Sequence, residues 1–265
     1  MRSLWLMYHD VYGEAPRVGV PASASAYHVS RAAFATHLAA IGRAGHRVVT
    51  VGDFLANRAA GGDSVVLTFD DGWIGGFEIA VPMLAEYGWR ATFYVTRDFV
   101  DRANFCGRAT LRAADAAGME IGVHGVTHRM LSSCSPAQIV AEFRDCRDYL
   151  ESLLGRPVVH GSIPGGDFTP AVAAAAGEAG LSSLANSRPG VNGAATPRFD
   201  LRRLAVRAST GAADLDRFCR FEVRRERVRW SLLQMPRAVL GMRNYSRLRR
   251  RLLLQGPGAS QVFDP

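Results

Sequence analysis

Short apolar stretches alternate with longer helical stretches along residues 1–206, and this alternation is the feature that most restricts the possible folds. The clearest helix covers residues 136–154, where apolar side chains recur at helical spacing, Pro136 stands near the start and Gly155 follows the end. A repeated strand–helix–strand order predicts a parallel sheet with helices on its faces. Periodicity alone does not distinguish an open sheet from a closed barrel. The predicted strands are residues 3–9, 47–51, 64–70, 90–95, 119–123, 158–163, 181–185 and 201–206.

The size and composition fit a single folded enzyme. A chain of 265 residues with 48% hydrophobic residues can form one barrel-sized domain with a substantial core. The 4 cysteines include no closely spaced pair, so neither a zinc knuckle nor a disulfide framework is expected, and a reducing compartment fits best. The apolar stretch after Met1 and Arg2 is too short for a signal peptide and lacks a small-residue cleavage site. We therefore expect a cytoplasmic protein.

Two motifs carry metal-binding side chains at the ends of predicted strands. Thr68-Phe69-Asp70-Asp71-Gly72 ends one strand, and His124-Gly125-Val126-Thr127-His128 follows another. The carboxyl ends of parallel strands form the active-site edge of an α/β fold. Adjacent carboxylates repel each other, which favours a bound cation or a division of roles into ligand and base. Either motif alone is ordinary, but an aspartate with two histidines is a three-ligand set typical of catalytic zinc sites.

The two motifs resemble those of polysaccharide deacetylases with a NodB-type homology domain, in carbohydrate esterase family 4. The resemblance covers residues 4–206 and implies an α/β fold with a single distorted (β/α) barrel of about seven strands. It also implies that Asp70 is the catalytic base, which takes a proton from water activated by a divalent metal ion. By the same resemblance Asp71, His124 and His128 hold this ion, for which zinc is the leading candidate.

Two motifs depart from the family pattern. Gly125 stands where the family has a serine or threonine, and Thr127 is a candidate for the missing hydroxyl bond. The family's Arg-x-Pro-x-Gly motif resembles residues 162–166, where the backbone N–H of Gly165 would hold the oxyanion. The arginine of that motif is absent. Arg203, in the strand at 201–206, is either a replacement that tethers Asp70 or a plain surface charge.

His9 is the candidate for the general acid. The family's C-terminal Leu-x-His motif has no match after residue 206, but Leu6-Met7-Tyr8-His9 closes the first predicted strand. In the poly-N-acetylglucosamine deacetylase branch, an early Tyr-His plays this part through a circular permutation of the barrel. The resemblance therefore implies that His9 protonates the departing amine. Without the resemblance, a single histidine after a strand is more often structural.

The C-terminal part carries most of the positive charge. We divide the chain into a barrel domain, residues 1–210, and an arginine-rich, helical extension, residues 211–265. All basic residues are arginine, and residues 202–265 hold 15 of the 32 arginines but only 5 of the 24 acidic residues. Within residues 230–254, which Pro236 divides, apolar and arginine side chains alternate in an amphipathic pattern. We expect this segment either to bind an anionic membrane surface or to pack on the barrel with its arginines in solvent. No nucleic-acid partner is expected.

These features predict a metal-dependent hydrolase that removes N-acetyl groups from an amino sugar in a polysaccharide or a lipid-linked glycan precursor. We expect it in the cytoplasm, peripheral on the inner membrane. One alternative is an esterase or amidase that acts on another acylated small molecule. The other is a non-catalytic carbohydrate-binding protein on the same fold, which the missing arginine favours and the retained Asp70 and metal ligands oppose.

Overall fold

The computed structural model describes residues 1–59 and 62–232. The strands are β1 Arg2–Tyr8, β2 Val11–Tyr12, β3 Val29–Ser30, β4 Arg47–Val49, β5 Ser64–Phe69, β6 Thr92–Val95, β7 Glu120–Val123, β8 His160–Ser162, β9 Ser183–Ala185, β10 Val191–Gly193 and β11 Leu204–Ala205. The α-helices are α1 Ala22–Ser25, α2 Arg31–Ala44, α3 Val51–Asn57, α4 Val81–Glu86, α5 Arg108–Ala116, α6 Pro136–Leu154, α7 Pro170–Glu178 and α8 Ala212–Cys219.

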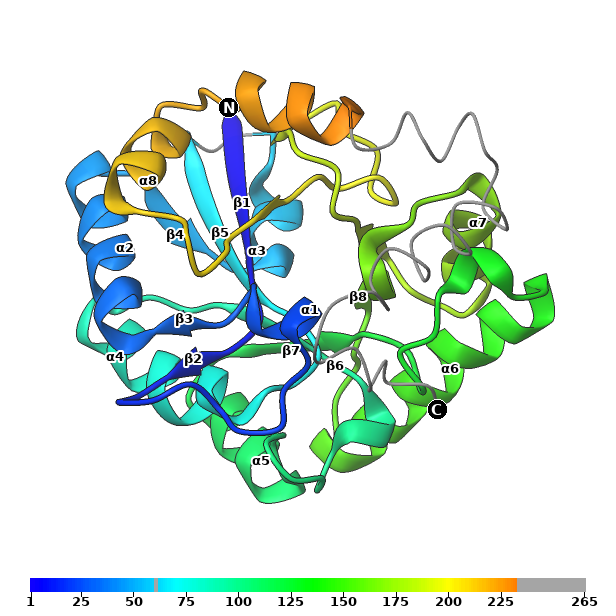
Figure 1. The fold of residues 1–265 in the computed structure, drawn as a ribbon. Coiled ribbons are helices and arrows are strands. Elements are labelled where there is room, and N and C mark those ends of the chain that lie inside the picture. The colour runs from blue at the N-terminus through cyan, green and yellow to red at the C-terminus, as the bar shows by residue number, and fades with distance from the viewer. Residues whose placement is uncertain (60–61, 233–265) are drawn as a thin grey trace.

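Most strands join one curled sheet, with the order β10-β1-β5-β6-β7-β8-β9 (Figure 1). All pairs along this path are parallel except β1 with β10, and β4 pairs with the first half of β5. Helices cover the outer face of the sheet, as the strand–helix alternation predicted. The register pairs Tyr8 with Phe69 and Val95 with Val123. His9 and Asp70 therefore leave β1 and β5 at the same level, and the two predicted motifs reach the same edge.

The segment that contains β11 closes the gap between the two ends of the curled sheet. On one side, the Leu201 N–H donates to the Leu184 carbonyl of β9 at 3.1 Å. On the other side, Leu204 and Ala205 pair with Leu6 and Met7 of β1. The predicted distorted (β/α) barrel is confirmed. Arg203 lies in this closing segment, between the residues that contact β9 and those that contact β1.

An apolar layer fills the barrel interior between polar side chains at both ends of the strands. Trp5 and Val66 face the interior, where they meet Val51 and Phe54 of α3. The rings of Trp5 and Phe54 meet edge to face, with centroids 5.4 Å apart. This cluster fills the middle of the barrel with buried apolar surface, which stabilises the barrel by removing that surface from water. At the amino ends of the strands, the Thr92 hydroxyl donates to Glu120 at 2.7 Å, and Nδ1 of His160 lies 2.9 Å from the Ser183 hydroxyl.

The long helix α6 begins and ends where the sequence predicted. The Ser135 hydroxyl accepts a hydrogen bond from the Gln138 N–H, and the Gln138 side chain accepts one from the Ser135 N–H. This reciprocal pair satisfies two backbone donors that a helix start leaves free. At the other end Gly155 adopts the left-handed conformation, with φ of 69°, that glycine reaches without steric cost. The antiparallel strand β10 was not predicted, because its three residues, Val-Asn-Gly, carry no strand signal.

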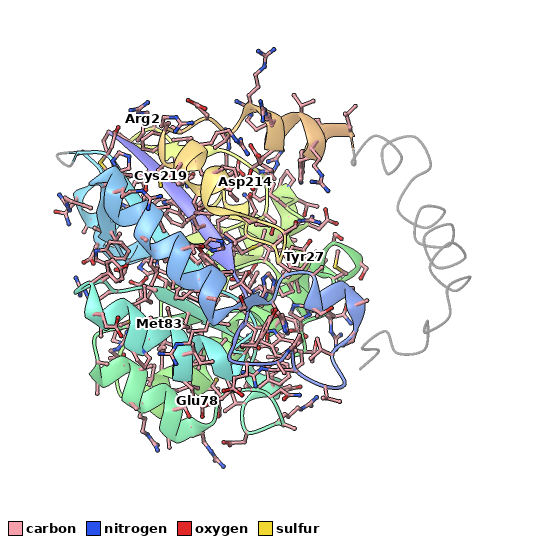
Figure 2. All side chains as sticks on the ribbon, turned by 60° about the vertical axis from the view of Figure 1, so that its left-hand side comes forward. Arg2, Tyr27, Glu78, Met83, Asp214 and Cys219 are labelled. Atoms are coloured by element: carbon pink, nitrogen blue, oxygen red, sulfur yellow. The ribbon has the colours of Figure 1, made fainter. Side chains whose placement is uncertain are left out.

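The described part of the C-terminal extension lies on the barrel. Helix α8 packs against α2, and Figure 2 shows Cys219 at the end of α8 beside this helix. Residues 224–232 form a further helical segment. The greater part of the predicted membrane-binding segment 230–254 lies outside the described residues. Among the helices of the described ranges, none combines the length and apolarity that crossing a membrane requires.

Candidate active site

Asp70 and Asp71 follow β5 directly, and the backbone turns sharply between them. The Asp70 N–H still donates to the Tyr8 carbonyl at 3.0 Å, as a continuation of the strand ladder. Asp71 then adopts a left-handed conformation with φ of 71°, and Gly72 has φ of 93°. Aspartate tolerates this region better than most residues. The turn gives the two carboxylates different partners, which reduces the repulsion that their adjacency would otherwise cause.

Arg203 holds the carboxylate of Asp70 from inside the barrel. Its Nη1 and Nη2 atoms donate to the two carboxylate oxygens at 2.6 and 2.8 Å, in the bidentate geometry that suits a guanidinium. The Nε atom donates to the Asn186 carbonyl at 2.9 Å, and Nη1 also reaches the Thr68 hydroxyl at 3.2 Å. Burial raises the pKa of Asp70, but the charge and hydrogen bonds of Arg203 outweigh it, so the pKa falls below its ordinary value. Asp70 is therefore ionised at neutral pH.

Asp71 forms a compact cluster with the two histidines of the second motif. Its Oδ1 atom lies 3.2 Å from Nε2 of His124 and 3.1 Å from Nε2 of His128. The three potential ligand atoms lie within 4.8 Å of one another. This oxygen is buried and has no hydrogen-bond partner within the described part of the chain. Three converging ligand atoms, one of them an unsatisfied carboxylate oxygen, fit a divalent cation.

Neighbouring groups orient the ligands of this cluster. The Nδ1 atom of His124 lies 2.5 Å from the Ser162 hydroxyl and 3.2 Å from the Ser162 carbonyl. When Nδ1 carries the proton, these oxygens accept it, and Nε2 keeps the free lone pair that a metal ligand requires. The Trp73 indole N–H donates to Oδ2 of Asp71 at 3.0 Å, which leaves Oδ1 to face the histidines.

The pKa shifts show that this cluster favours positive charge. Burial alone would lower the pKa of His128, but the carboxylate of Asp71 outweighs it and raises the pKa. Burial would raise the pKa of Asp71, but the charge of His128 and the close approach of both imidazoles lower it well below its ordinary value. A proton and a metal cation would thus compete for the nitrogen and oxygen atoms of this cluster.

His9 lies at the same edge of the barrel. Its ring packs against the ring of Tyr27, with centroids 5.0 Å apart, and Nδ1 is buried without a hydrogen-bond partner among residues 1–59 and 62–232. Burial lowers the pKa of His9, while the negative charges of Asp71 and Asp70 act in the opposite direction. The pairing of Tyr8 with Phe69 places His9 at the level of Asp70 on the neighbouring strand.

Gly165 lies in a tight turn next to the metal-ligand loop. The turn Pro164–Gly166 follows β8, whose last residue, Ser162, bonds to His124. Gly165 has φ of 65°, and a Cβ atom there would come within 2.6 Å of the Met130 sulfur. The turn therefore needs glycine both for its backbone conformation and for space.

The structure thus brings together all seven residues singled out from the sequence, although Gly165 lies at the margin. Three further residues at the site were not predicted: Trp73, Ser162 in its role as the partner of His124, and Glu142. Trp73 directly follows the first motif, so its position was a usable signal. Glu142 lies in the middle of α6, and nothing in its local sequence indicates that it faces the site.

Comparisons with known proteins agree with this geometry. Residues 57–184 match the family model of the polysaccharide deacetylases. The matched range includes Asp70, Asp71 and both histidines of the second motif, whereas His9 and Arg203 lie outside it.

Similarity to individual proteins extends over most of the chain. YxkH of Bacillus subtilis (strain 168), a protein assigned to the polysaccharide deacetylases, is 22% identical over 205 residues, which span 76% of this chain and 70% of that protein. The structure of the Streptococcus pyogenes deacetylase PplD in complex with acetate has a TM-score of 0.71 and 22% identity, and covers 81% of this chain and 96% of that one. IcaB from Ammonifex degensii has a TM-score of 0.68 and 24% identity, with coverage of 81% and 97%. At these identities the two structures establish a shared fold.

We predict that Arg203→Met destabilises the protein strongly, because it leaves the buried carboxylate of Asp70 without a partner. Breaking a buried pair in this way costs about 3–5 kcal/mol. The matched control is Arg202→Met, which removes the neighbouring, half-buried arginine. Urea unfolding at neutral pH measures both. Since protonation of Asp70 removes the unpaired charge, the deficit of Arg203→Met should shrink as the pH falls; a deficit equal to that of the control would contradict the assigned role.

Proposed function

The chain belongs to the polysaccharide deacetylase family and is a hydrolase of C–N bonds other than peptide bonds, and from this premise we propose that it removes N-acetyl groups from an amino-sugar glycan by a metal-dependent mechanism. One observation supports the proposal most directly: the two adjacent carboxylates have partners of different chemical kinds. Asp70 is bound by a guanidinium, whereas Asp71 faces two imidazole nitrogens. Such a division suits one base and one metal ligand at a single strand end.

Asp71, His124 and His128 would hold the divalent ion. A bound ion of this kind polarises a carbonyl oxygen and makes water a stronger nucleophile near neutral pH. Zinc is the proposed metal, because two imidazoles and one carboxylate with open positions suit it, although other divalent ions accept the same set. The Ser162 and Trp73 contacts keep the ligand atoms in place.

Asp70 is the general base of the proposed mechanism. Its lowered pKa keeps it ionised, and Arg203 fixes the plane of the carboxylate. Each carboxylate oxygen can accept more than one hydrogen bond, so the pair with Arg203 leaves capacity for a proton from water. Asp70 accepts that proton as the nucleophile attacks the acetyl carbonyl.

His9 and Gly165 complete the proposed mechanism. His9 donates a proton to the departing amine, and the backbone N–H of Gly165 stabilises the oxyanion. Burial lowers the pKa of His9, so an acid role limits activity on the alkaline side as the imidazole loses its proton. Asp70 limits activity on the acid side, because its carboxylate must be ionised.

Aromatic rings next to the cluster support a sugar as the substrate. The ring of Phe99 lies 5.7 Å from that of His128, and Phe105 contacts both Phe99 and Trp73, with centroid distances of 4.5 and 4.4 Å. Pockets that bind small molecules combine apolar and aromatic walls with a few polar groups. An acetylated polysaccharide or a lipid-linked precursor of one is the proposed substrate.

The proposed location is the cytoplasmic face of the inner membrane. Support comes from the helical segment 224–232, where Val228 and Leu232 are 52% and 60% exposed. Arg224, Arg225 and Arg229 line the same surface hollow as these two apolar residues. On another side of the segment, the ring of Trp230 lies near the Arg188 guanidinium of the barrel domain. Exposed apolar side chains ringed by arginines suit an anionic lipid surface.

Acetate release tests the proposed activity directly. The zinc-loaded protein is expected to release acetate from N-acetylglucosamine oligomers, and the metal-stripped protein is not. O-acetylated xylan oligomers serve as the comparison, because an ester is easier to cleave than an amide. Release from the esters alone would favour the esterase alternative, and release from neither would favour a binding protein.

Metal analysis separates the two aspartates. Asp71→Ala, His124→Ala and His128→Ala are each expected to lose most bound metal, because each removes one of the three protein ligands. Asp70→Asn should keep the metal and lose turnover. Because protons compete at His128, whose pKa is raised, the metal affinity of the unaltered protein should increase as the pH rises past the ordinary histidine range. Equal metal loss in all four variants would disprove the division of roles.

His9→Ala is expected to keep fold and metal and to slow deacetylation by on the order of 10²-fold, the usual scale for the loss of a general acid. The alkaline limb of the pH–rate profile should change in this variant, whereas a merely structural role would leave it in place. His46→Ala is a matched control, because this histidine bonds to the Cys219 carbonyl on α8 and lies outside the proposed site. An unchanged rate for His9→Ala would exclude the assignment.

Liposome sedimentation tests the location. The full chain is expected to sediment with vesicles that contain phosphatidylglycerol at low salt, and less at high salt because ions screen the attraction. Arg224→Glu, Arg225→Glu and Arg229→Glu together should abolish sedimentation without changing activity on a soluble oligosaccharide. Three exposed arginines elsewhere, Arg31, Arg108 and Arg144, changed to Glu provide the same change in net charge. Equal loss in both triple variants would show only a general charge effect.

A further inference from the structure

Glu142 is a buried acidic residue near the middle of α6, with 6% of its surface exposed. A carboxylate in such a place is costly unless hydrogen bonds or charges compensate it. Helix α6 is 19 residues long, is capped at both ends and packs against α7 and β7. The carboxylate is therefore attached to one of the firmest elements of the fold.

The groups that compensate Glu142 all come from the loop that carries the two histidines. Oε2 accepts hydrogen bonds from the Val126 N–H at 2.7 Å and from the Thr127 N–H at 2.9 Å. Oε1 accepts from the Thr127 hydroxyl at 2.7 Å and lies 3.0 Å from Nε of Arg129. One carboxylate thus binds three groups between His124 and His128 and a fourth directly after His128.

This loop needs an external support because its own backbone is irregular. Gly125 and His128 both have positive φ, 80° and 62°, so the residues between the ligands form no helical ladder. For a residue with a Cβ, such as His128, this conformation persists only when the surroundings impose it. On the carbonyl side, the Gly125 and Val126 oxygens accept from the N–H groups of Arg97 and Asp98, at 3.1 and 3.0 Å. The N–H groups of Val126 and Thr127 are bound by Glu142.

We propose that Glu142 is a positioning residue for the metal ligands: through Thr127 and the neighbouring N–H groups it fixes the spacing of His124 and His128 against Asp71. The proposal rests on the proposed function, in which these three residues bind a divalent ion. Thr127 links Glu142 to the loop through its side chain. Its hydroxyl donates to Glu142 and accepts from Nε of Arg129 at 2.8 Å. The hydrogen bonds of Glu142 go to the loop, while its charge also acts through space on His128. Thr127→Val separates these two contributions, because it removes a loop contact and keeps the carboxylate.

The distinguishing measurement is the affinity of the metal-stripped protein for Zn²⁺ and Co²⁺, determined against a chromophoric chelator. Glu142→Gln is expected to weaken binding by about 10-fold or more, the range observed when support of a metal ligand is lost. Thr127→Val should weaken binding in the same direction, and Thr127→Ser should restore it because the hydroxyl is kept. The visible spectrum of bound Co²⁺ should also change in Glu142→Gln, since the ligand geometry relaxes.

Glu151→Gln is the matched control. This glutamate lies on the same helix and also supports a backbone N–H, that of Val158 at 2.9 Å, far from the histidine loop. Its loss is expected to lower the thermal midpoint and leave metal affinity unchanged. If Glu142→Gln fails to fold, Thr127→Val carries the same test, because it removes one contact and keeps the two backbone N–H bonds to Glu142. Thr127→Ser is its control, since the hydroxyl is kept.

The possible results separate the two proposals. Unchanged affinity and an unchanged Co²⁺ spectrum in Glu142→Gln or, where that variant does not fold, in Thr127→Val would overturn the positioning role while leaving the metal site itself intact. Equal affinity loss in Glu151→Gln would also overturn it, because it would show a general effect of stability. If the unaltered protein binds neither ion, the metal-dependent mechanism fails, and the positioning role fails with it.

Discussion

The ion pair between Arg203 and Asp70 is the interaction on which the rest of this structure depends. Both partners are buried, and such a pair is stable only when the geometry is good and the remaining donors are satisfied. Here two bonds join guanidinium and carboxylate, and a third reaches the Asn186 carbonyl. The pair links the end of β5 to the segment that closes the barrel between β9 and β1. The same ion pair therefore both helps to close the barrel and orients the proposed base.

The second constraint is the adjacency of Asp70 and Asp71. On a regular strand, successive side chains point to opposite faces, but the strand ends at Phe69 and the chain turns. The left-handed conformation of Asp71 directs the second carboxylate to the histidines. Each carboxylate thus has its own positive or metal-binding partner, and the two pKa values are both lowered for different reasons.

An apolar layer inside the barrel helps to explain why the site can be so highly charged. Burial of Trp5 and Phe54 in this layer contributes stability that does not depend on the site. The carboxyl end can then hold unsatisfied groups, such as Oδ1 of Asp71 and Nδ1 of His9. Unsatisfied buried atoms at one edge of a well-packed barrel are expected where a ligand completes the structure.

The sequence by itself determined the alternation of strands and helices, the limits of α6 and the two motifs that meet at one edge. These follow from local rules: apolar periodicity, a proline and a glycine at the helix ends, and the parallel order of strands. The tertiary structure alone decided that Arg203 faces Asp70 across 133 positions of the chain, and that Glu142 supports the histidine loop from a neighbouring helix. Neither contact has a local signal, because each depends on how distant segments pack. The sequence left Arg203 as either a tether of Asp70 or a surface charge, and barrel closure decides between them by turning the side chain inward.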